Sequence, residues 1–203
     1  MVGLRDSLSI PQVYQAFQTA GGFFGARLRS MQKYLQIPEG ARIIDVGCGP
    51  GFLRQYLPDS CVYFGFDTDQ RYIDWAKRDP QPNASYECRI FDKAVAAGLA
   101  PVDVIMMNGL LHHLTDQEAT ELLAVSAAAL APGGKIFTLD GCYTPTQSLF
   151  RKKLLDWDRG EYVRTQGAYE SLFPAKDVTV SSHIDEDFSR VSYTFISIVA
   201  SRR

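Results

Sequence analysis

The sequence lacks a marked excess of charge of either sign. Its 203 residues contain 21 Lys and Arg against 23 Asp and Glu, a net charge of -2. Proteins that bind nucleic acid or anionic membranes usually show an excess of basic residues, so we expect neither as a partner. Basic residues cluster locally in "FRKKLLDWDRG" (150–160). We interpret this cluster as the solvated face of a helix.

The sequence also lacks paired cysteines and long apolar runs. Cys48, Cys61, Cys88 and Cys142 are widely spaced and form no CxxC pair, so we expect no metal site and no disulfide framework. No stretch approaches the roughly 18 uninterrupted apolar residues of a membrane span, and the N-terminus has no apolar region typical of a signal peptide. These features predict a protein of the reducing cytoplasm, as a monomer or a homodimer.

Short apolar runs alternate with helix-like segments along much of the chain. This alternation predicts an α/β fold with a Rossmann-like, doubly wound and mostly parallel sheet, with helices on both faces. Helices are expected over "GFLRQYL" (51–57), over "QRYIDWAKR" (70–78), and from the capping-box spacing of Thr115 and Glu118 onward. The predicted strands are 42–46, 62–66, 86–90, 102–107 and 135–139, followed by a terminal hairpin of 177–182 and 191–201.

We expect one domain over residues 1–203, with four parts. Residues 1–40 form an N-terminal helical cap, 41–141 the ligand-binding core, 142–175 a helical insert or lid, and 176–203 the C-terminal hairpin. Aromatic residues of the cap have helical spacing, which is typical of a core stripe. Alternatively they form a lid over a substrate pocket. These aromatic residues are Tyr14, Phe17, Phe23 and Phe24.

The stretch "IIDVGCGPGF" (43–52) ends the first predicted strand at an acid and then supplies three glycines. Glycines in such a turn let a ligand lie against the backbone. A dinucleotide fingerprint needs a third glycine where this chain has Phe52. Asp45 at the strand end repels a pyrophosphate but attracts an ammonium or a sulfonium. The turn therefore favours S-adenosylmethionine over a nicotinamide dinucleotide.

Three further strands also end in polar residues. Asp67 in "FGFDTD" stands where an acid accepts hydrogen bonds from both ribose hydroxyls. Asp92 in "RIFD" follows the third strand, where a carboxylate accepts from an adenine amino group, and Asn108 ends the fourth. Because the ends of parallel strands meet at one edge of the sheet, these side chains are expected around one crevice.

With these motifs the chain resembles the class I S-adenosylmethionine-dependent methyltransferases, of the small-molecule type found in ubiquinone and menaquinone biosynthesis. The resemblance rests on "DVGCGPG", "GFD", "FD", "NGLLHHL" and "LAPGGKIFTLD", over roughly 41–141. It implies a seven-stranded sheet with one antiparallel edge strand, and S-adenosylhomocysteine as product. The implied cofactor-binding residues are Asp45, Gly47, Cys48, Gly49, Gly51, Asp67, Thr68, Asp92 and, through its backbone, Asn108.

Methyl transfer needs placement and exclusion of water more than covalent chemistry. His112 and His113 follow the fourth strand, and an imidazole titrates near neutral pH, so they are the candidate catalytic residues. We expect His112 to face the acceptor and His113 to be structural. The alternative is that one histidine caps the following helix and packs structurally.

The second half also resembles small bacterial methyltransferases of polysaccharide and lipid gene clusters through "DRG-x-x-VR…Y". Arg159 and Arg164 in this stretch are either solvated or clamp an anionic group of the acceptor, and Tyr14 is the third candidate substrate contact. The predicted acceptor is a small molecule, and oxygen, nitrogen and carbon all remain open as its methylated atom. A nicotinamide-dependent oxidoreductase and a non-catalytic cofactor-binding module are the alternatives.

Overall fold

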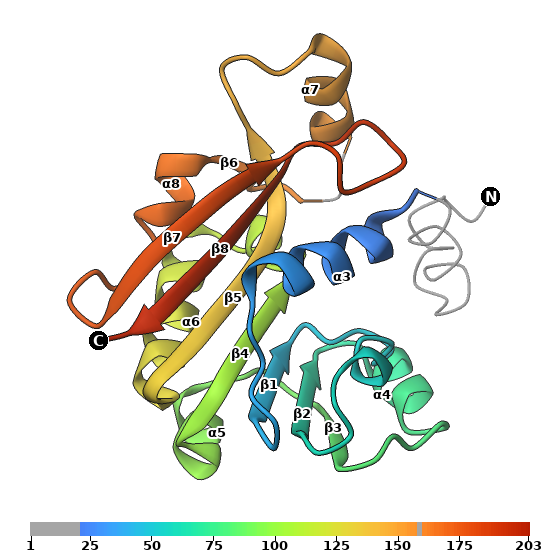
Figure 1. The fold of residues 1–203 in the computed structure, drawn as a ribbon, viewed down its shortest axis with the longest axis vertical. Helices are drawn as coiled ribbons and strands as arrows, with labels where there is room; N and C mark the ends of the chain where they lie inside the picture. Colours follow the sequence, from blue (N-terminus) through green and yellow to red (C-terminus); the bar gives the residue numbers. More distant parts are fainter. Residues whose placement is uncertain (1–20, 158–159) are drawn as a thin grey trace.

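A twisted sheet runs through the centre of the protein, and its central strands point their carboxyl ends toward one edge (Figure 1). The computed structural model describes residues 21–157 and 160–203. The strands are β1 (Arg42–Val46), β2 (Val62–Asp67), β3 (Ala84–Cys88), β4 (Val102–Asn108), β5 (Leu130–Tyr143), β6 (Arg164–Thr165), β7 (Val178–Asp185) and β8 (Phe195–Arg202).

Helices and short 3-10 turns connect these strands. The helices are α3 (Phe23–Tyr34), α4 (Gln70–Ala76), α5 (Lys93–Leu99), α6 (Asp116–Ala129), α7 (Leu149–Asp156) and α8 (Gln166–Glu170). The 3-10 turns are η1 (Arg54–Tyr56) and η2 (Leu111–His113). None of the helices in the described ranges has the length and hydropathy needed to cross a membrane.

The strand order is β3-β2-β1-β4-β5-β8-β7, and the short β6 pairs with β5. The order reverses between β1 and β4, and ligands of open α/β sheets bind at such a reversal. The predicted fold class is confirmed. The antiparallel strand is β8, which lies between β5 and the edge strand β7, so the predicted terminal hairpin does lie at one edge of the sheet.

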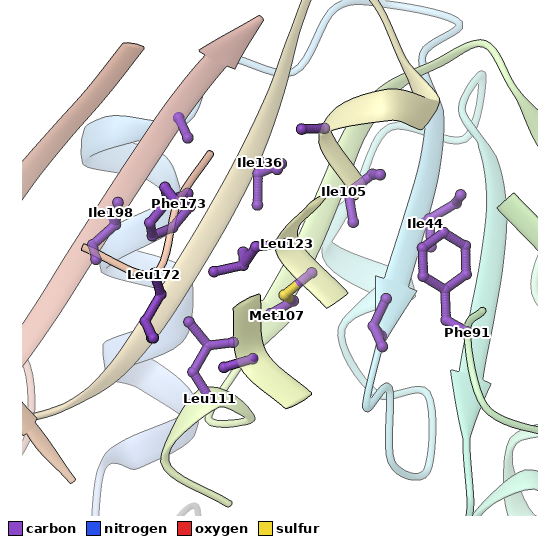
Figure 2. Close-up of a cluster of buried hydrophobic side chains, with 14 of the residues drawn as sticks. Ile44, Phe91, Ile105, Met107, Leu111, Leu123, Ile136, Leu172, Phe173 and Ile198 are labelled. Atoms are coloured by element: carbon purple, nitrogen blue, oxygen red, sulfur yellow. The ribbon is translucent and has the colours of Figure 1, made fainter. Parts of the chain in front are cut away.

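The core has two halves because alternate residues of a strand point to opposite faces. On β1, Ile43 packs with residues of α3 and α4, whereas its neighbour Ile44 packs with residues of α5 and α6. Both isoleucines are fully buried. Figure 2 shows Ile44 among the side chains of the second half. Burial on both faces explains why the strands read as continuous apolar runs.

Most element boundaries agree with the predictions, and four strands differ. The third strand begins at Ala84 and the last at Phe195, β5 extends from Leu130 to Tyr143, and β7 continues to Asp185. The capping box of α6 is confirmed, since the Thr115 hydroxyl accepts from the backbone of Glu118 and the Glu118 carboxylate accepts from the backbone of Thr115.

The predicted helix at 51–57 is wrong, because this segment forms only the 3-10 turn η1. The side chain of Arg54 is 1% exposed and donates to backbone carbonyls around it. The hydrogen bonds of this buried guanidinium hold the chain in a compact loop. In a regular helix the Arg54 side chain would point outward. The accepting carbonyls belong to Leu57, Pro58, Asp59, Cys61 and Pro82.

Candidate active site

The turn after β1 places three glycines beside the end of β2. Gly47, Gly49 and Gly51 have φ angles of 73°, 54° and 76°, in the left-handed region that glycine adopts without strain. The backbone N–H groups of Gly47 and Cys48 donate to the carbonyl of Phe66 at 2.8 and 3.0 Å. The turn is therefore a fixed stretch of backbone at the carboxyl end of the central strands.

The side chains of this turn pack beneath it. Cys48 is half-buried, and its Sγ lies 2.9 Å from the position that a Cβ on Gly65 would occupy. Burial raises the pKa of the Cys48 thiol well above its usual value, so the group stays neutral. A Cβ on Gly51 would lie 2.8 Å from the ring of Tyr86. The geometry leaves the backbone of the turn as the part that meets a ligand.

Asp67 connects the end of β2 to this turn. Its two carboxylate oxygens accept from the backbone N–H groups of Gly49 at 2.8 Å and of Asp69 at 2.9 Å. Burial raises the pKa of Asp67. Asp69, and not Asp67, caps α4 by accepting from the backbone of Arg71. Thr68 is exposed beside them. Asp67 thus remains available for the predicted ribose contact.

Asp45 is 2% exposed at the end of β1, and its Oδ2 accepts from the hydroxyl of Tyr63 at 2.7 Å. Burial raises the pKa of Asp45 to about 7, while the positive charge of Arg27 acts in the opposite direction. The guanidinium of Arg27, on α3, lies 3.3 Å from the position of a Cβ on Gly109. A cation from α3 and an acid from β1 therefore lie near one another, at the ends of β1 and β4.

Asn108 lies on the same face as Asp45. Asp45 pairs with Met106 across β1 and β4, and Asn108 follows Met106 by two residues, so alternation puts both polar side chains on one face. Asn108 is 6% exposed, and its amide oxygen and nitrogen have no hydrogen-bond partner within the described residues. Buried amide groups in native proteins almost always have a hydrogen-bond partner. The unpartnered amide of Asn108 therefore suits a polar ligand.

Asp92 lies at the start of α5 and is exposed. Its carboxylate accepts from the backbone N–H of Val95 at 2.9 Å, which makes it the N-cap of this helix. The predicted contact with adenine stays a prediction beside this structural role.

His112 forms a pair with Asp140, which is 2% exposed near the end of β5. The Nδ1 of His112 lies 2.7 Å from Oδ1 of Asp140, and the same oxygen accepts from the backbone N–H of His112 at 3.2 Å. We assign the proton of this hydrogen bond to Nδ1, because a carboxylate acts as the acceptor, and the lone pair of the neutral ring is then on Nε2. Asp140 ends the motif "LAPGGKIFTLD", and no role was predicted for it.

The chain returns over His112 after α7. A Cβ on Gly160 would collide with the imidazole of His112, and the backbone N–H of Tyr162 donates to the carbonyl of His112 at 3.0 Å. His113 is exposed, with its ring centroid 4.2 Å from that of His112. His112 is thus the buried histidine of the two.

Arg164 fixes the position of η2. Its guanidinium donates to the carbonyls of Leu111 at 2.8 Å and Leu114 at 2.6 Å, and to the carboxylate of Asp116 at 2.8 Å. A further bond reaches the carbonyl of Tyr162. These bonds give Arg164 a structural role, and they do not support the predicted contact with an anionic acceptor.

Two predicted substrate contacts, Tyr14 and Arg159, lie outside the described residues. Phe23 packs edge-on against Tyr193, as expected of a core aromatic.

Within 21–157 and 160–203, no group of three or more His, Cys, Asp or Glu side chains is arranged so that it could hold a metal ion. Arg27 was missed by the sequence analysis, because no motif marks it. Asp140 ends an apolar run as Asp45 does, and this signal would have identified it.

A cavity of about 400 Å³ lies elsewhere, between α5 and α6. Its lining consists of Lys93, Val125 and several alanines. None of the predicted site residues contributes to it, so the candidate active site remains the group of polar residues at the strand ends.

Comparison with known proteins agrees with this geometry. The profile of a family described as "Methyltransferase domain" matches residues 23–180. The ubiquinone biosynthesis O-methyltransferase of Coxiella burnetii is 30% identical over 115 residues, which cover 55% of this chain and 47% of the relative. The trans-aconitate 2-methyltransferase of Variovorax paradoxus is 33% identical over 133 residues, which cover 62% of this chain and 50% of the relative.

Among solved structures, a TehB-like SAM-dependent methyltransferase from Corynebacterium glutamicum aligns with a TM-score of 0.66 at 21% identity. The alignment covers 99% of this chain and 100% of that one, and shows a shared fold. The chain spans about half the length of the curated relatives it matches. From the family match over most of its length, the chain belongs to the class I S-adenosylmethionine-dependent methyltransferases.

Proposed function

We propose that this protein transfers a methyl group from S-adenosylmethionine to a small-molecule acceptor. One observation carries the proposal. A buried acid, Asp45, and a cation, Arg27, lie near one another beside a glycine turn at the reversal of strand order. Opposite charges in this arrangement fit the ammonium and carboxylate of an amino acid, which the methionine end of the cofactor provides.

The residues of the crevice suit the rest of the cofactor. The backbone from Gly47 to Gly49 and the amide of Asn108 are proposed to contact the methionine end. Each carboxylate oxygen of Asp67 accepts one backbone N–H and keeps capacity for a ribose hydroxyl. Asp92 and Thr68 are proposed for the adenosine end. Bound S-adenosylmethionine supplies a methyl group on a positively charged sulfur, which is already a good leaving group.

His112 is proposed as the general base for an acceptor hydroxyl or amine. Asp140 holds Nδ1 of its ring at 2.7 Å, so that Nε2 accepts the proton that the acceptor loses. The buried carboxylate of Asp140 also stabilises the imidazolium that forms. His113 is exposed and is not required for this step.

The named relatives are described as a ubiquinone biosynthesis O-methyltransferase and a trans-aconitate 2-methyltransferase, which favours a small molecule as acceptor here. Against a nicotinamide enzyme, Asp45 disfavours a pyrophosphate and Phe52 replaces the third glycine. Against a non-catalytic module, the pair of His112 and Asp140 supplies an oriented base. The cytoplasmic location and the oligomeric state stay predictions.

Thermal unfolding with S-adenosylhomocysteine tests the proposal without a known acceptor. At a ligand concentration of about 100 times Kd, binding stabilises the folded state by about 2.7 kcal/mol, which raises Tm by roughly 5–10 °C for a chain of this size. NAD is expected to leave Tm unchanged. A shift with NAD and none with S-adenosylhomocysteine would refute the proposal.

Two neighbouring acids provide a matched pair of variants for this measurement. Asp67→Ala is expected to abolish the shift, because it removes the proposed ribose contact. Asp69→Ala removes the cap of α4 and is expected to lower the starting Tm but keep the shift.

A further inference from the structure

Helix α7 presents apolar side chains to solvent. Leu149, Phe150 and Trp157 are 86%, 61% and 78% exposed. At 100° per residue, these three side chains and Lys153 fall within one arc of about 100° on the helix. The opposite side carries Leu155, which is 1% exposed and packs against the end of β5 near Gly141. The helix is therefore attached by one face and leaves an apolar face uncovered.

The attachment of α7 is polar as well as apolar. Arg151 forms an ion pair with Glu186 and donates to the hydroxyl of Ser192 at 2.9 Å. Asp156, which lies beside Leu149 on the exposed side of the helix, accepts from the hydroxyl of Tyr143 at 2.6 Å. The bonds of Arg151 and the burial of Leu155 fix which side of the helix faces the protein.

Positive charge accompanies the exposed apolar side chains. Lys152 and Lys153 are both exposed, and neither forms an ion pair within the described residues. The ammonium of Lys153 lies over the ring of Trp157 at 5.7 Å from its centroid. The cluster thus lies on a solvated helix face, as expected, and large apolar side chains share that face with the lysines.

The exposed apolar residues concentrate around α7. Six large apolar side chains are exposed in the described residues, and four of them lie between 149 and 162. The two outside this segment, Tyr56 and Ile90, belong to η1 and to the loop after β3. A concentrated apolar patch on an otherwise polar surface marks a site of interaction.

We propose that the face of α7 formed by Leu149, Phe150, Lys152, Lys153 and Trp157 binds the surface of a lipid bilayer that carries anionic headgroups. Apolar and aromatic side chains enter the boundary between headgroups and acyl chains, while lysines contact the anionic headgroups. This is charge complementarity between the lysines and the lipid. The proposal does not depend on methyl transfer.

The size of the patch favours a lipid surface over a second copy of the chain. Each partner of a stable protein interface contributes about 800 Å², whereas one aromatic side chain buries at most about 250 Å². Two aromatics and one leucine on a helix of eight residues fall short of that area. A fluid surface has no such requirement, because each side chain inserts independently.

The position of α7 links the proposed membrane binding to the active site. The helix follows the carboxyl end of β5 and stands beyond the edge of the sheet at which the active site lies (Figure 1). Gly160, three residues past Trp157, packs against the ring of His112. A bilayer bound to α7 is thus connected through a few residues to the histidine of the site.

The test uses the full chain and vesicles of two compositions, pure phosphatidylcholine and an equal mixture with phosphatidylglycerol. The sequence has two tryptophans, so Trp75→Phe leaves Trp157 as the only reporter. Anionic vesicles are expected to shift its emission to shorter wavelength and to co-sediment with the protein at least fivefold more than neutral vesicles. Raising the salt concentration to about 0.5 M is expected to reduce this preference.

Variants separate the two contributions, and circular dichroism establishes that each is folded. Leu149→Gln with Phe150→Gln is expected to abolish sedimentation with vesicles, while Ile90→Gln removes an equally exposed side chain elsewhere and is expected to change nothing. Lys152→Glu with Lys153→Glu is expected to abolish the preference for anionic vesicles. The matched control, Lys77→Glu with Lys93→Glu, is expected to keep it.

Three results would overturn the proposal. The first is a parent protein that binds neither vesicle. The second is binding that the α7 variants leave unchanged. The third is a parent that is dimeric by light scattering and becomes monomeric on Leu149→Gln with Phe150→Gln, which would assign the face to a second copy of the chain.

Discussion

At the scale of a single residue, we expect the protonation of one carboxyl group to control the proposed cofactor site. Asp45 is buried, and burial raises its pKa to about 7 in the ligand-free fold. A raised pKa means that the fold favours the protonated acid, so this group stabilises the free protein at low pH and loses that effect as pH rises through 7. A cationic ligand needs the ionised form. Ligand binding and protonation therefore compete at this residue.

We predict that affinity for S-adenosylhomocysteine rises with pH between about 5.5 and 7 and levels above 7. The limiting slope is about tenfold in Kd per pH unit, because one proton is released on binding. Titration calorimetry in buffers of different ionisation enthalpy measures both Kd and the released proton. Asp45→Asn is expected to bind more weakly and to lose the pH dependence. An unchanged pH profile in this variant would exclude Asp45 as the group concerned.

The residues of the site were predictable to different degrees. Asp45, Asp67 and Asn108 follow apolar runs, so strand periodicity alone placed them at one edge of the sheet. Arg27 and Asp140 come from α3 and β5, and their proximity to Asp45 and His112 arises only when the chain folds. Three of the four partners of Arg164 are likewise backbone carbonyls, which no side-chain pattern reveals.

At the scale of elements, η2 is held from two sides. Asp140 accepts from the ring and the backbone of His112 on one side, and Arg164 donates to the carbonyls of Leu111 and Leu114 on the other. A turn of three residues has little stability of its own, so these bonds determine where the imidazole lies. The orientation of the proposed base is thus a property of β5 and β6.

We predict that Asp140→Asn lowers turnover by about 100-fold or more and leaves affinity for S-adenosylhomocysteine unchanged. The amide nitrogen of Asn donates, so Nδ1 must accept and the ring proton moves to Nε2, where a base is needed. The measurement is transfer from labelled S-adenosylmethionine to an acceptor found in a metabolite screen. Glu121→Gln, on an exposed acid of α6 whose carboxylate bonds, in the described residues, only to Gln117, is the control, with an expected change below about threefold. Equal losses in both variants would contradict the assignment.

The turn η1 shows why local pattern fails for some elements. Its sequence has the apolar spacing of a helix, yet Arg54 folds inward and satisfies several carbonyls of the following loop. A buried guanidinium is stable only with such partners. The arrangement depends on Pro82, which is 28 residues distant in the chain, so no local reading anticipates it.

At the scale of the whole molecule, the order of the strands sets both the site and the distribution of stability. β4 pairs with β1 and β5, whereas β3 pairs in the described residues only with β2. Alternation of strands and helices predicted this mixed architecture, because parallel strands need crossover connections. β8 lies inside the sheet because it pairs with β5, which is distant in the sequence. A local sequence pattern does not reveal such a pairing.

We predict that the amides of β1, β4 and β5 exchange with solvent at least tenfold more slowly than those of β3. An edge strand opens by separating from one neighbour, whereas a central strand exchanges through opening close to the global unfolding. Hydrogen exchange followed by mass spectrometry measures both. Saturating S-adenosylhomocysteine is expected to slow exchange at residues 47–51 and 108–112, which form the proposed cofactor site, and to leave the largely exposed segment 77–83 between α4 and β3 unchanged. Equal rates in β3 and β4 would contradict the first expectation, and protection confined to α5 and α6 would move the ligand to the cavity between those helices.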